Sequence, residues 1–230
     1  INIANQADVI VAALGESAEM SGEASSRTNI DIPEIQKDLL KALLKTGKPV
    51  VMVLFTGRPL ALKWESENVP AILNVWFGGS EAGYAVADVL FGDVNPSGKL
   101  STTFPQTIGQ VPIYYAHKNT GRPLGDGNWF QKFRSNYLAV SNDPLYPFGF
   151  GLSYTNFEYS NVLLNKNSMT QNGSITASVT VRNSGSRDGA EVVQLYLRDV
   201  LSTVARPVIE LKGFQSIFLK AGEEKTIEFR

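Results

Sequence analysis

The first part of the chain alternates short apolar runs with segments whose apolar side chains recur at helical spacing. Residues 7–14, 50–55 and 71–77 are continuous apolar runs, as expected of strands covered on both faces. Residues 33–47 and 80–92 have the spacing of helices, the second one capped by Ser80 and closed near Gly92. Strands that alternate with helices in this way predict an α/β fold with a mostly parallel sheet sandwiched by helices.

The helix at residues 33–47 has start and stop signals at its two ends. Asp31 and Glu34 have the spacing of a capping box, Pro33 lies in the first turn, and Gly47 marks the C-terminal stop. Five apolar side chains share one helical stripe: Ile35, Leu39, Leu40, Leu43 and Leu44.

The pattern changes after residue 95 and again after residue 157. Residues 95–156 are rich in Gly, Pro, Asn and aromatic side chains, and we expect them to wrap the sheet or to reach a neighbour. Period-two alternation then predicts a small antiparallel sandwich. Its four predicted strand segments are residues 174–185, 190–199, 209–222 and 225–230. The predicted domains are therefore residues 1–156 and 157–230.

Composition narrows the range of partners. The 230 residues carry 21 Lys and Arg against 22 Asp and Glu, so charge gives no reason to expect nucleic acid or an anionic membrane. No apolar run is long enough to span a membrane, and no signal peptide opens the chain. The lack of cysteine excludes disulfides and thiolate catalysis. Because the chain begins without Met and ends inside an alternating pattern, we expect it to be a fragment.

Phosphate, dinucleotide and metal sites lack their motifs. A Walker loop needs GxxxxGK[ST] and a dinucleotide site needs GxGxxG after a strand, whereas Gly15 and Gly22 are seven positions apart with no lysine between or after them. The single histidine, His117, cannot form a His-rich metal site and has no GxSxG elbow nearby. We predict no cofactor and no metal, and a structural or incidental role for His117.

A polar segment at residues 15–33, GESAEMSGEASSRTNIDIP, leaves the carboxyl end of the first predicted strand, where parallel sheets bind their ligands. Its glutamates, Glu16, Glu19 and Glu23, are candidate general acids. The general frequency of exposed glutamates favours the alternative, that all three are solvated loop charges. Glu23 is the best placed, because the small residues of SGEASS allow close approach. An ion pair with Arg27 would oppose an acid role for Glu23, so on this hypothesis Arg27 binds another partner, such as Glu16 or a backbone carbonyl.

Several long motifs follow one another along the chain: GEASSRTNIDIP, QKDLLKAL, GKPVVMVLFTGRPL, WFGGSEAGYAVADVLFGDVNPSGKLSTTFP and YPFGFGLSYTNF. In this order they resemble the C-terminal part of glycoside hydrolase family 3 enzymes, the bacterial periplasmic β-glucosidases among them. VTVRNSGSRDGAEVVQLYLRD and RPVIELKGF resemble the fibronectin type III-like domain that ends many members. The resemblance covers essentially the whole chain.

This resemblance implies retaining hydrolysis of a terminal β-D-glucosyl or related residue by two carboxyl groups, about 5 to 5.5 Å apart. The family's nucleophile, an aspartate, belongs to an N-terminal (β/α)8 barrel to which no part of this chain is similar. The family's acid/base glutamate lies in a motif that GEASSR matches, so the resemblance implies Glu23 as the acid/base, with Glu16 and Glu19 as minor candidates. Ser26 stands where many relatives have aspartate.

Further expectations follow from the resemblance. The substrate is a β-linked oligosaccharide or glycoside, the location is periplasmic or secreted, and this chain alone is inactive because the barrel is missing. Trp129 and Phe130, in the GDGNWF loop, are candidates for the wall of a sugar subsite. Trp76 and Phe77 end a predicted buried strand and are expected in the core.

The family's α/β domain begins with a further strand and helix that this chain lacks. We therefore expect an exposed sheet edge or apolar face, covered by a second copy in a homo-oligomer, by a partner chain or by rearranged loops. The alternative function is that of a non-catalytic module that binds carbohydrate or protein as a scaffold.

Overall fold

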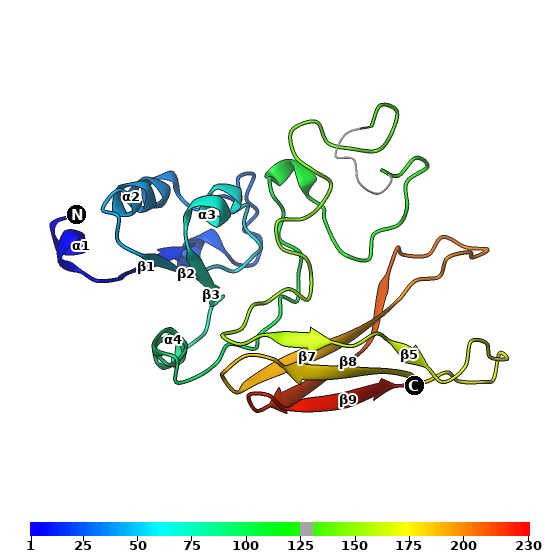
Figure 1. Cartoon of the computed structure of the whole chain (residues 1–230). Helices are drawn as coiled ribbons and strands as arrows, with labels where there is room; N and C mark the ends of the chain where they lie inside the picture. The colour runs from blue at the N-terminus through cyan, green and yellow to red at the C-terminus, as the bar shows by residue number, and fades with distance from the viewer. Residues whose placement is uncertain (125–130) are drawn as a thin grey trace. The chain divides into compact units, whose positions relative to one another are not determined.

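A computed structural model describes residues 1–124 and 131–230 (Figure 1). The chain forms two compact units. The first comprises Ile1–Val86, Thr102–Tyr114 and Thr120–Phe148, and the second comprises Ala87–Ser101, Tyr115–Asn119 and Gly149–Arg230.

The first unit is an α/β unit built on a three-stranded parallel sheet. Strands β1 (Ile10–Gly15), β2 (Val50–Phe55) and β3 (Ala71–Asn74) lie in the order β1-β2-β3, with Ile10 opposite Val50 and Val51 opposite Ala71. Helices α2 (Glu34–Leu44) and α3 (Lys63–Asn68) make the two crossovers and lie over one face of the sheet (Figure 1). The predicted α/β class and parallel sheet are confirmed.

Short helices complete the description of this unit. Helix α1 (Asn2–Gln6) precedes the sheet, and α4 (Ala82–Phe91) follows it and continues into the second unit. Single 3-10 turns occur at η1 (Ala18–Met20) and η2 (Ile108–Gln110). The predicted end of α4 is confirmed, because Gly92 directly follows the helix with φ +83°.

Strand β1 is covered on one face only, which corrects the prediction of a strand buried on both faces. Ile10 and Ala12 are buried, whereas Val11 on the opposite face is 52% exposed. The described residues supply helices to one side of this strand, so its other side keeps apolar solvent-accessible surface. This confirms the expected exposed sheet face, and what covers it remains a prediction.

Helix α2 begins later than its start signals predict. Pro33 occupies the N-cap position and makes no side-chain cap bond. Asp31 therefore lies two residues before the N-cap and Glu34 is the first helical residue, so the two do not form a capping box. The predicted stop is confirmed, since Gly47 with φ +71° ends the turn that follows the helix. Within the apolar stripe, Leu40 and Leu43 are buried while Ile35 and Leu39 are exposed.

Strand β3 ends three residues before the predicted strand does. Trp76 has φ +53°, which takes the chain out of the extended conformation, and its ring packs 5.7 Å from that of Phe104. Phe77 is 52% exposed, so its predicted place in the core is wrong. The turn at Trp76 breaks the alternation that would have directed the Phe77 side chain inward.

The second unit contains the predicted antiparallel sandwich. Strands β4 (Phe157–Tyr159) and β5 (Leu163–Leu164) lie along one edge of β6 (Ala177–Asn183), and β9 (Glu224–Phe229) lies along the other. Strands β7 (Gly189–Leu197) and β8 (Glu210–Leu219) form a second antiparallel pair. Both sheets contribute to one core of buried side chains, made of Val181, Val193, Ile217, Leu219 and Ile227. The predicted sandwich is confirmed.

Residues before the sandwich belong to its unit by their contacts. Asn95 donates to the Asp188 carbonyl at 2.9 Å and accepts from the Ser153 hydroxyl at 2.9 Å. Lys99 pairs with Glu191 at 3.1 Å. Segments 87–101 and 149–156 are therefore part of the packing of the second unit, although the sequence pattern assigns them to the first domain.

Candidate active-site loop

The polar segment begins at a close crossing of the first two strands. Gly15 has φ +133°, and a Cβ atom there would lie 1.8 Å from the Phe55 carbonyl oxygen, so only glycine fits. The Gln36 side-chain amide accepts from the Gly15 N–H at 2.8 Å and donates to its carbonyl at 3.0 Å. Helix α2 thus fixes the point at which the loop leaves the sheet.

Glu16, the next residue, has a completely buried side chain and binds four groups. One carboxylate oxygen accepts from Arg27 at 2.7 Å and lies 3.1 Å from Nε of Arg58. The other accepts from the Thr56 hydroxyl at 2.8 Å and from the Gly57 N–H at 3.1 Å. A buried carboxylate with this many donors is a fully paired charge.

The pKa of Glu16 is lower than usual. Burial by itself raises the pKa, but the hydrogen bonds from Arg27, Thr56 and Gly57 and the charge of Arg58 outweigh it. A carboxyl group with a lowered pKa is a poor general acid at neutral pH. Glu16 therefore fits a structural role in the loop.

The arginines that Glu16 binds also hold the main chain of the loop. Arg27 donates to the Asp31 carbonyl at 3.2 Å, and Arg58 donates to the Met20 carbonyl at 2.6 Å. A Cβ atom at Gly57 would lie 2.0 Å from the Ser21 hydroxyl, so the loop packs directly against the connection after β2. These contacts fix the loop on both sides of Glu23.

Glu23 lies at the exposed tip of this loop. A turn closed by the Ser25 N–H on the Gly22 carbonyl, at 3.2 Å, contains Glu23 and Ala24, and Ala24 has φ +56°. The Glu23 carboxyl group makes no hydrogen bond or ion pair with any residue that the structure describes. The expectation that Arg27 binds a partner other than Glu23, such as Glu16 or a backbone carbonyl, is confirmed, and Arg27 binds both.

The third glutamate of the segment, Glu19, is exposed in the 3-10 turn η1. The hydrogen bond from its own backbone amide, together with one from the Ser17 side chain, holds the pKa of Glu19 below its usual value. This direction favours the carboxylate over the protonated acid.

The remaining sequence candidates lie elsewhere. Trp129 and Phe130 fall outside the described residues. His117 is exposed, with Nδ1 3.2 Å from the Lys118 carbonyl oxygen. Within residues 1–124 and 131–230, no group of three or more His, Asp or Glu side chains could hold a metal ion, and no helix is long and apolar enough to cross a membrane.

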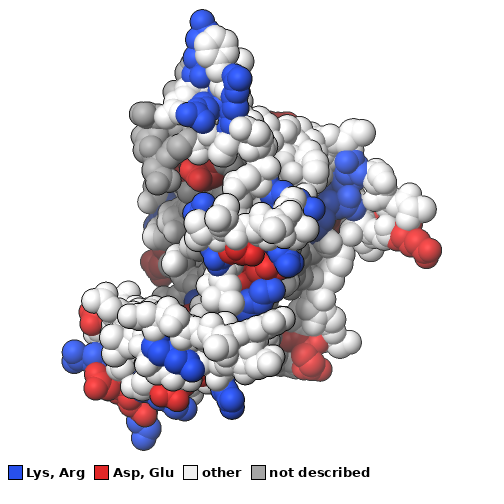
Figure 2. Space-filling view, turned by 90° about the vertical axis from the view of Figure 1, so that its right-hand side faces the viewer, with Lys and Arg blue, Asp and Glu red and all other residues white. Residues whose placement is uncertain are grey.

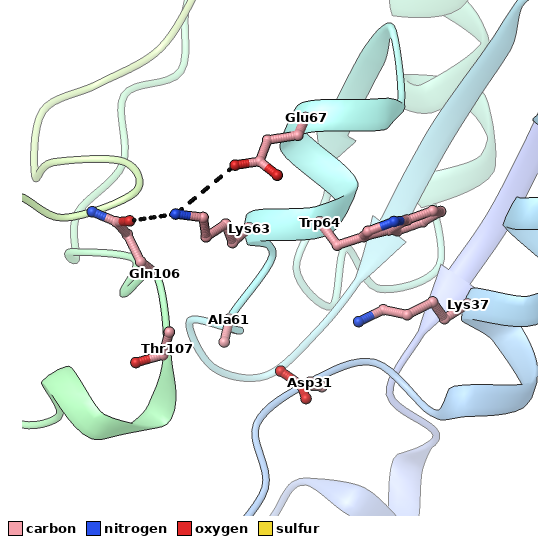
Figure 3. A pocket seen from close by; sticks show the side chains of 8 residues that line it. All are labelled: Asp31, Lys37, Ala61, Lys63, Trp64, Glu67, Gln106 and Thr107. Atoms are coloured by element: carbon pink, nitrogen blue, oxygen red, sulfur yellow. Dashed lines mark hydrogen bonds and ion pairs between the residues drawn. The ribbon is translucent and has the colours of Figure 1, made fainter. Parts of the chain in front are cut away.

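An open pocket of about 270 Å³ lies in the α/β unit, and sequence reasoning missed it (Figure 3). Lys63 projects from α3 between the side chains of Gln106, at 3.2 Å, and Glu67, at 3.9 Å (Figure 3). The Trp64 ring lies 5.8 Å from the Lys37 ammonium. The residues that line the pocket come from three separate parts of the chain, residues 31–37, 61–67 and 106–107, so no local sequence motif indicates the pocket.

Sequence reasoning also missed Thr56, Arg58 and Gln36 as partners of the candidate loop. Thr56 and Arg58 belong to TGRPL, which directly follows β2. The carboxyl ends of adjacent parallel strands meet at one edge of a sheet, so polar residues after β2 were a signal for contact with the loop after β1. Gln36 gave no such signal.

Comparison with known proteins shows which protein family the chain belongs to. Residues 1–154 match the glycosyl hydrolase family 3 C-terminal domain, and residues 191–230 match the fibronectin type III-like domain. The chain therefore belongs to the family of glycosyl hydrolase family 3 C-terminal domains. The family resemblance read from the sequence motifs is confirmed.

Individual relatives are similar over the whole chain. A periplasmic β-glucosidase of Salmonella typhimurium is 56% identical over 229 residues, which cover 100% of this chain and 30% of that protein. A β-xylosidase of Formosa agariphila is 46% identical, with 100% and 31% covered. The crystal structure of a β-glucosidase from Listeria innocua in complex with isofagomine superposes with a TM-score of 0.92 at 49% identity, covering 96% of this chain and 31% of the other. The chain thus spans about a third of the length of these relatives.

Proposed function

We propose that this chain forms the acid/base part of a retaining β-glucosidase, with Glu23 as the acid/base and a nucleophile from polypeptide outside the chain. The support comes from the family, from relatives named as β-glucosidases, and from the geometry of the loop. One observation carries the assignment to Glu23. Arg27 is bound to Glu16 and to the Asp31 carbonyl, so it leaves the Glu23 carboxyl group free to meet a substrate.

The chemistry follows from two carboxyl groups about 5 to 5.5 Å apart. In the first step, the external nucleophile attacks the anomeric carbon while Glu23 gives its proton to the departing glycosidic oxygen, and the bond between that oxygen and the anomeric carbon breaks. In the second step, the Glu23 carboxylate takes a proton from water, the water oxygen attacks the anomeric carbon, and the nucleophile is released. Glu23 ends the cycle protonated, as it began.

The substrate is a terminal β-D-glucosyl residue of a glycoside or oligosaccharide. The names of the β-glucosidases from Salmonella typhimurium and Listeria innocua support this choice, and the β-xylosidase relative makes β-xylosides the comparison substrate. The Salmonella typhimurium relative also supports a periplasmic location, which fractionation of cells that produce the full-length protein would test.

The test is Glu23→Ala in the full-length enzyme, assayed with an aryl β-glucoside that has a dinitrophenolate leaving group. Such a leaving group departs without a proton, so we expect the glycosyl intermediate to form and its hydrolysis to become slow. Azide needs no general base, and it should restore kcat and yield β-glucosyl azide. Unchanged hydrolysis by the variant, or a loss that azide does not restore, would refute the role of Glu23. Activity independent of Glu23 would instead favour the scaffold function.

A further inference from the structure

The Glu23 carboxyl group makes no hydrogen bond or ion pair with the described residues, so the main chain around Glu23 must set its position. The loop from residue 17 to residue 33 contains one 3-10 turn and no strand, and Glu23 lies in an exposed turn. A general acid has to meet the leaving-group oxygen within hydrogen-bond reach, so an unsupported loop would lose most of its effect. Some other group should therefore hold this turn.

Arg58 is the side chain with the necessary contacts. Its Nη2 atom donates to the Met20 carbonyl at 2.6 Å and lies 3.4 Å from the Ser25 carbonyl, so it reaches the chain on both sides of Glu23. At 22% exposure the Arg58 side chain is largely buried. Its Nε lies 3.1 Å from Glu16, which fixes the guanidinium at its other end.

We propose that Arg58, anchored by Glu16, is a positioning residue for the acid/base turn of the proposed enzyme. The planar guanidinium spans a buried carboxylate and two carbonyls at once, which a lysine ammonium on a flexible stem cannot do. Glu16 is held from the opposite side by Thr56 and Gly57, at the carboxyl end of β2. The contacts of Arg58 and Glu16 thereby connect the turn to the end of a strand in the sheet, although the turn itself contains no strand or helix.

This inference rests on the proposed role of Glu23, and the test separates the two. Arg58→Lys and Glu23→Ala are made in the full-length enzyme and assayed for kcat/KM with two aryl β-glucosides. One has a dinitrophenolate leaving group that needs no proton, and the other has a phenolate of high pKa that does. General acid catalysis contributes roughly 10²- to 10⁴-fold, so displacing the acid should cost about 10- to 100-fold with the second substrate and little with the first.

Glu16→Gln provides a second route to the same result, because it keeps the shape of the anchor and removes its charge. We expect it to repeat the leaving-group pattern of Arg58→Lys. Arg182 is an exposed arginine on strand β6, and Arg182→Lys is the matched control. This control should leave kcat/KM unchanged for both substrates.

The outcomes are distinct. If Arg58→Lys lowers kcat/KM equally for both leaving groups, Arg58 acts through general stability and the positioning role is wrong. If Arg58→Lys and Glu16→Gln leave both values unchanged while Glu23→Ala shows the leaving-group pattern, the positioning role is wrong and the acid/base assignment stands. If Glu23→Ala itself shows no leaving-group dependence, the proposed function fails first.

Discussion

At the scale of single residues, the buried Glu16 carboxylate joins two parts of the α/β unit. It binds Arg27 of the loop, and it binds Thr56, Gly57 and Arg58 of the segment that follows β2. Removing one partner from a buried charge network is costly because the remaining charges stay desolvated. Glu16 should therefore matter for stability as well as for the position of the loop.

We expect Glu16→Gln to lower the free energy of unfolding by about 2 to 4 kcal/mol at pH 7. The folded pKa of Glu16 lies below the unfolded value, so its contribution is fully present above the unfolded pKa and is lost as pH falls through the folded pKa. The difference between wild type and variant should be constant from neutral pH down to the usual glutamate value of 4.5, and should shrink below it. Urea unfolding at several pH values, followed by tryptophan fluorescence, measures this.

The exposed Glu19 provides the control for that measurement, because Glu19→Gln should leave the unfolding free energy nearly unchanged at neutral pH. Tryptophan fluorescence is a suitable signal for the unfolding of the domain that contains Glu16, because all three tryptophans occur before residue 130 in the sequence. A Glu16→Gln difference that does not shrink at acid pH would contradict the assigned charge state of Glu16.

At the scale of elements, the end of strand β8 in the sandwich separates its two faces by alternation. In β8, Ile217 and Leu219 are buried in the shared core, whereas Phe218 between them is 62% exposed. Strand β1 alternates in the same way, with Val11 on its uncovered face. The period of two determines which side chains of a strand face the core. We therefore expect the loss of folding free energy on substitution to depend more on the face than on the residue type.

Two neighbouring substitutions in β8 test this. Leu219→Ala removes a fully buried side chain that is 0% exposed and should cost about 2 to 5 kcal/mol, seen by calorimetry as a lower melting temperature of the sandwich. Phe218→Ala removes a larger but exposed side chain and should cost only about 0.5 kcal/mol or less. A larger loss for Phe218→Ala would mean that this face of β8 is covered in the protein.

At the scale of the whole molecule, the charges nearly balance, with a net charge of −1. Figure 2 shows both lysine or arginine (blue) and aspartate or glutamate (red) side chains on the face that it draws. The proposed function requires a second carboxyl group, because a retaining mechanism divides its roles between a nucleophile and an acid/base. The chain spans about a third of the length of the relatives that it matches.

We therefore expect the purified 230-residue chain to show no turnover of an aryl β-glucoside. The measurement is release of the phenol, compared with the same chain carrying Glu23→Gln. Activity common to both preparations indicates a contaminating enzyme. Turnover by the wild-type chain that Glu23→Gln abolishes would show that the chain carries its own nucleophile, and would overturn the proposed division of roles.

The sequence by itself determined the three strands of the parallel sheet, helices α2 and α4 and the four long strands of the sandwich, because these depend on local periodicity and turn residues. Val50–Phe55 was predicted to the residue, since Pro49 precedes that strand and the polar Thr56 follows it. The sequence also singled out Glu23 and predicted that Arg27 binds elsewhere, by simple charge logic. The early end of β3, the missing capping box and the exposed Phe77 escaped prediction, because backbone turns near residues 33 and 76 override the side-chain pattern.

Only the tertiary structure decided which groups support the candidate loop. Arg58 lies 35 positions after Glu23, and Gln36 meets Gly15 across 21 positions, so their contacts arise from the parallel pairing of β1 with β2 and the packing of α2. Periodicity reports which side of an element is apolar, and it does not report which polar side chains two crossovers bring to the same sheet edge. That meeting point depends on strand order and register, which only the folded chain defines.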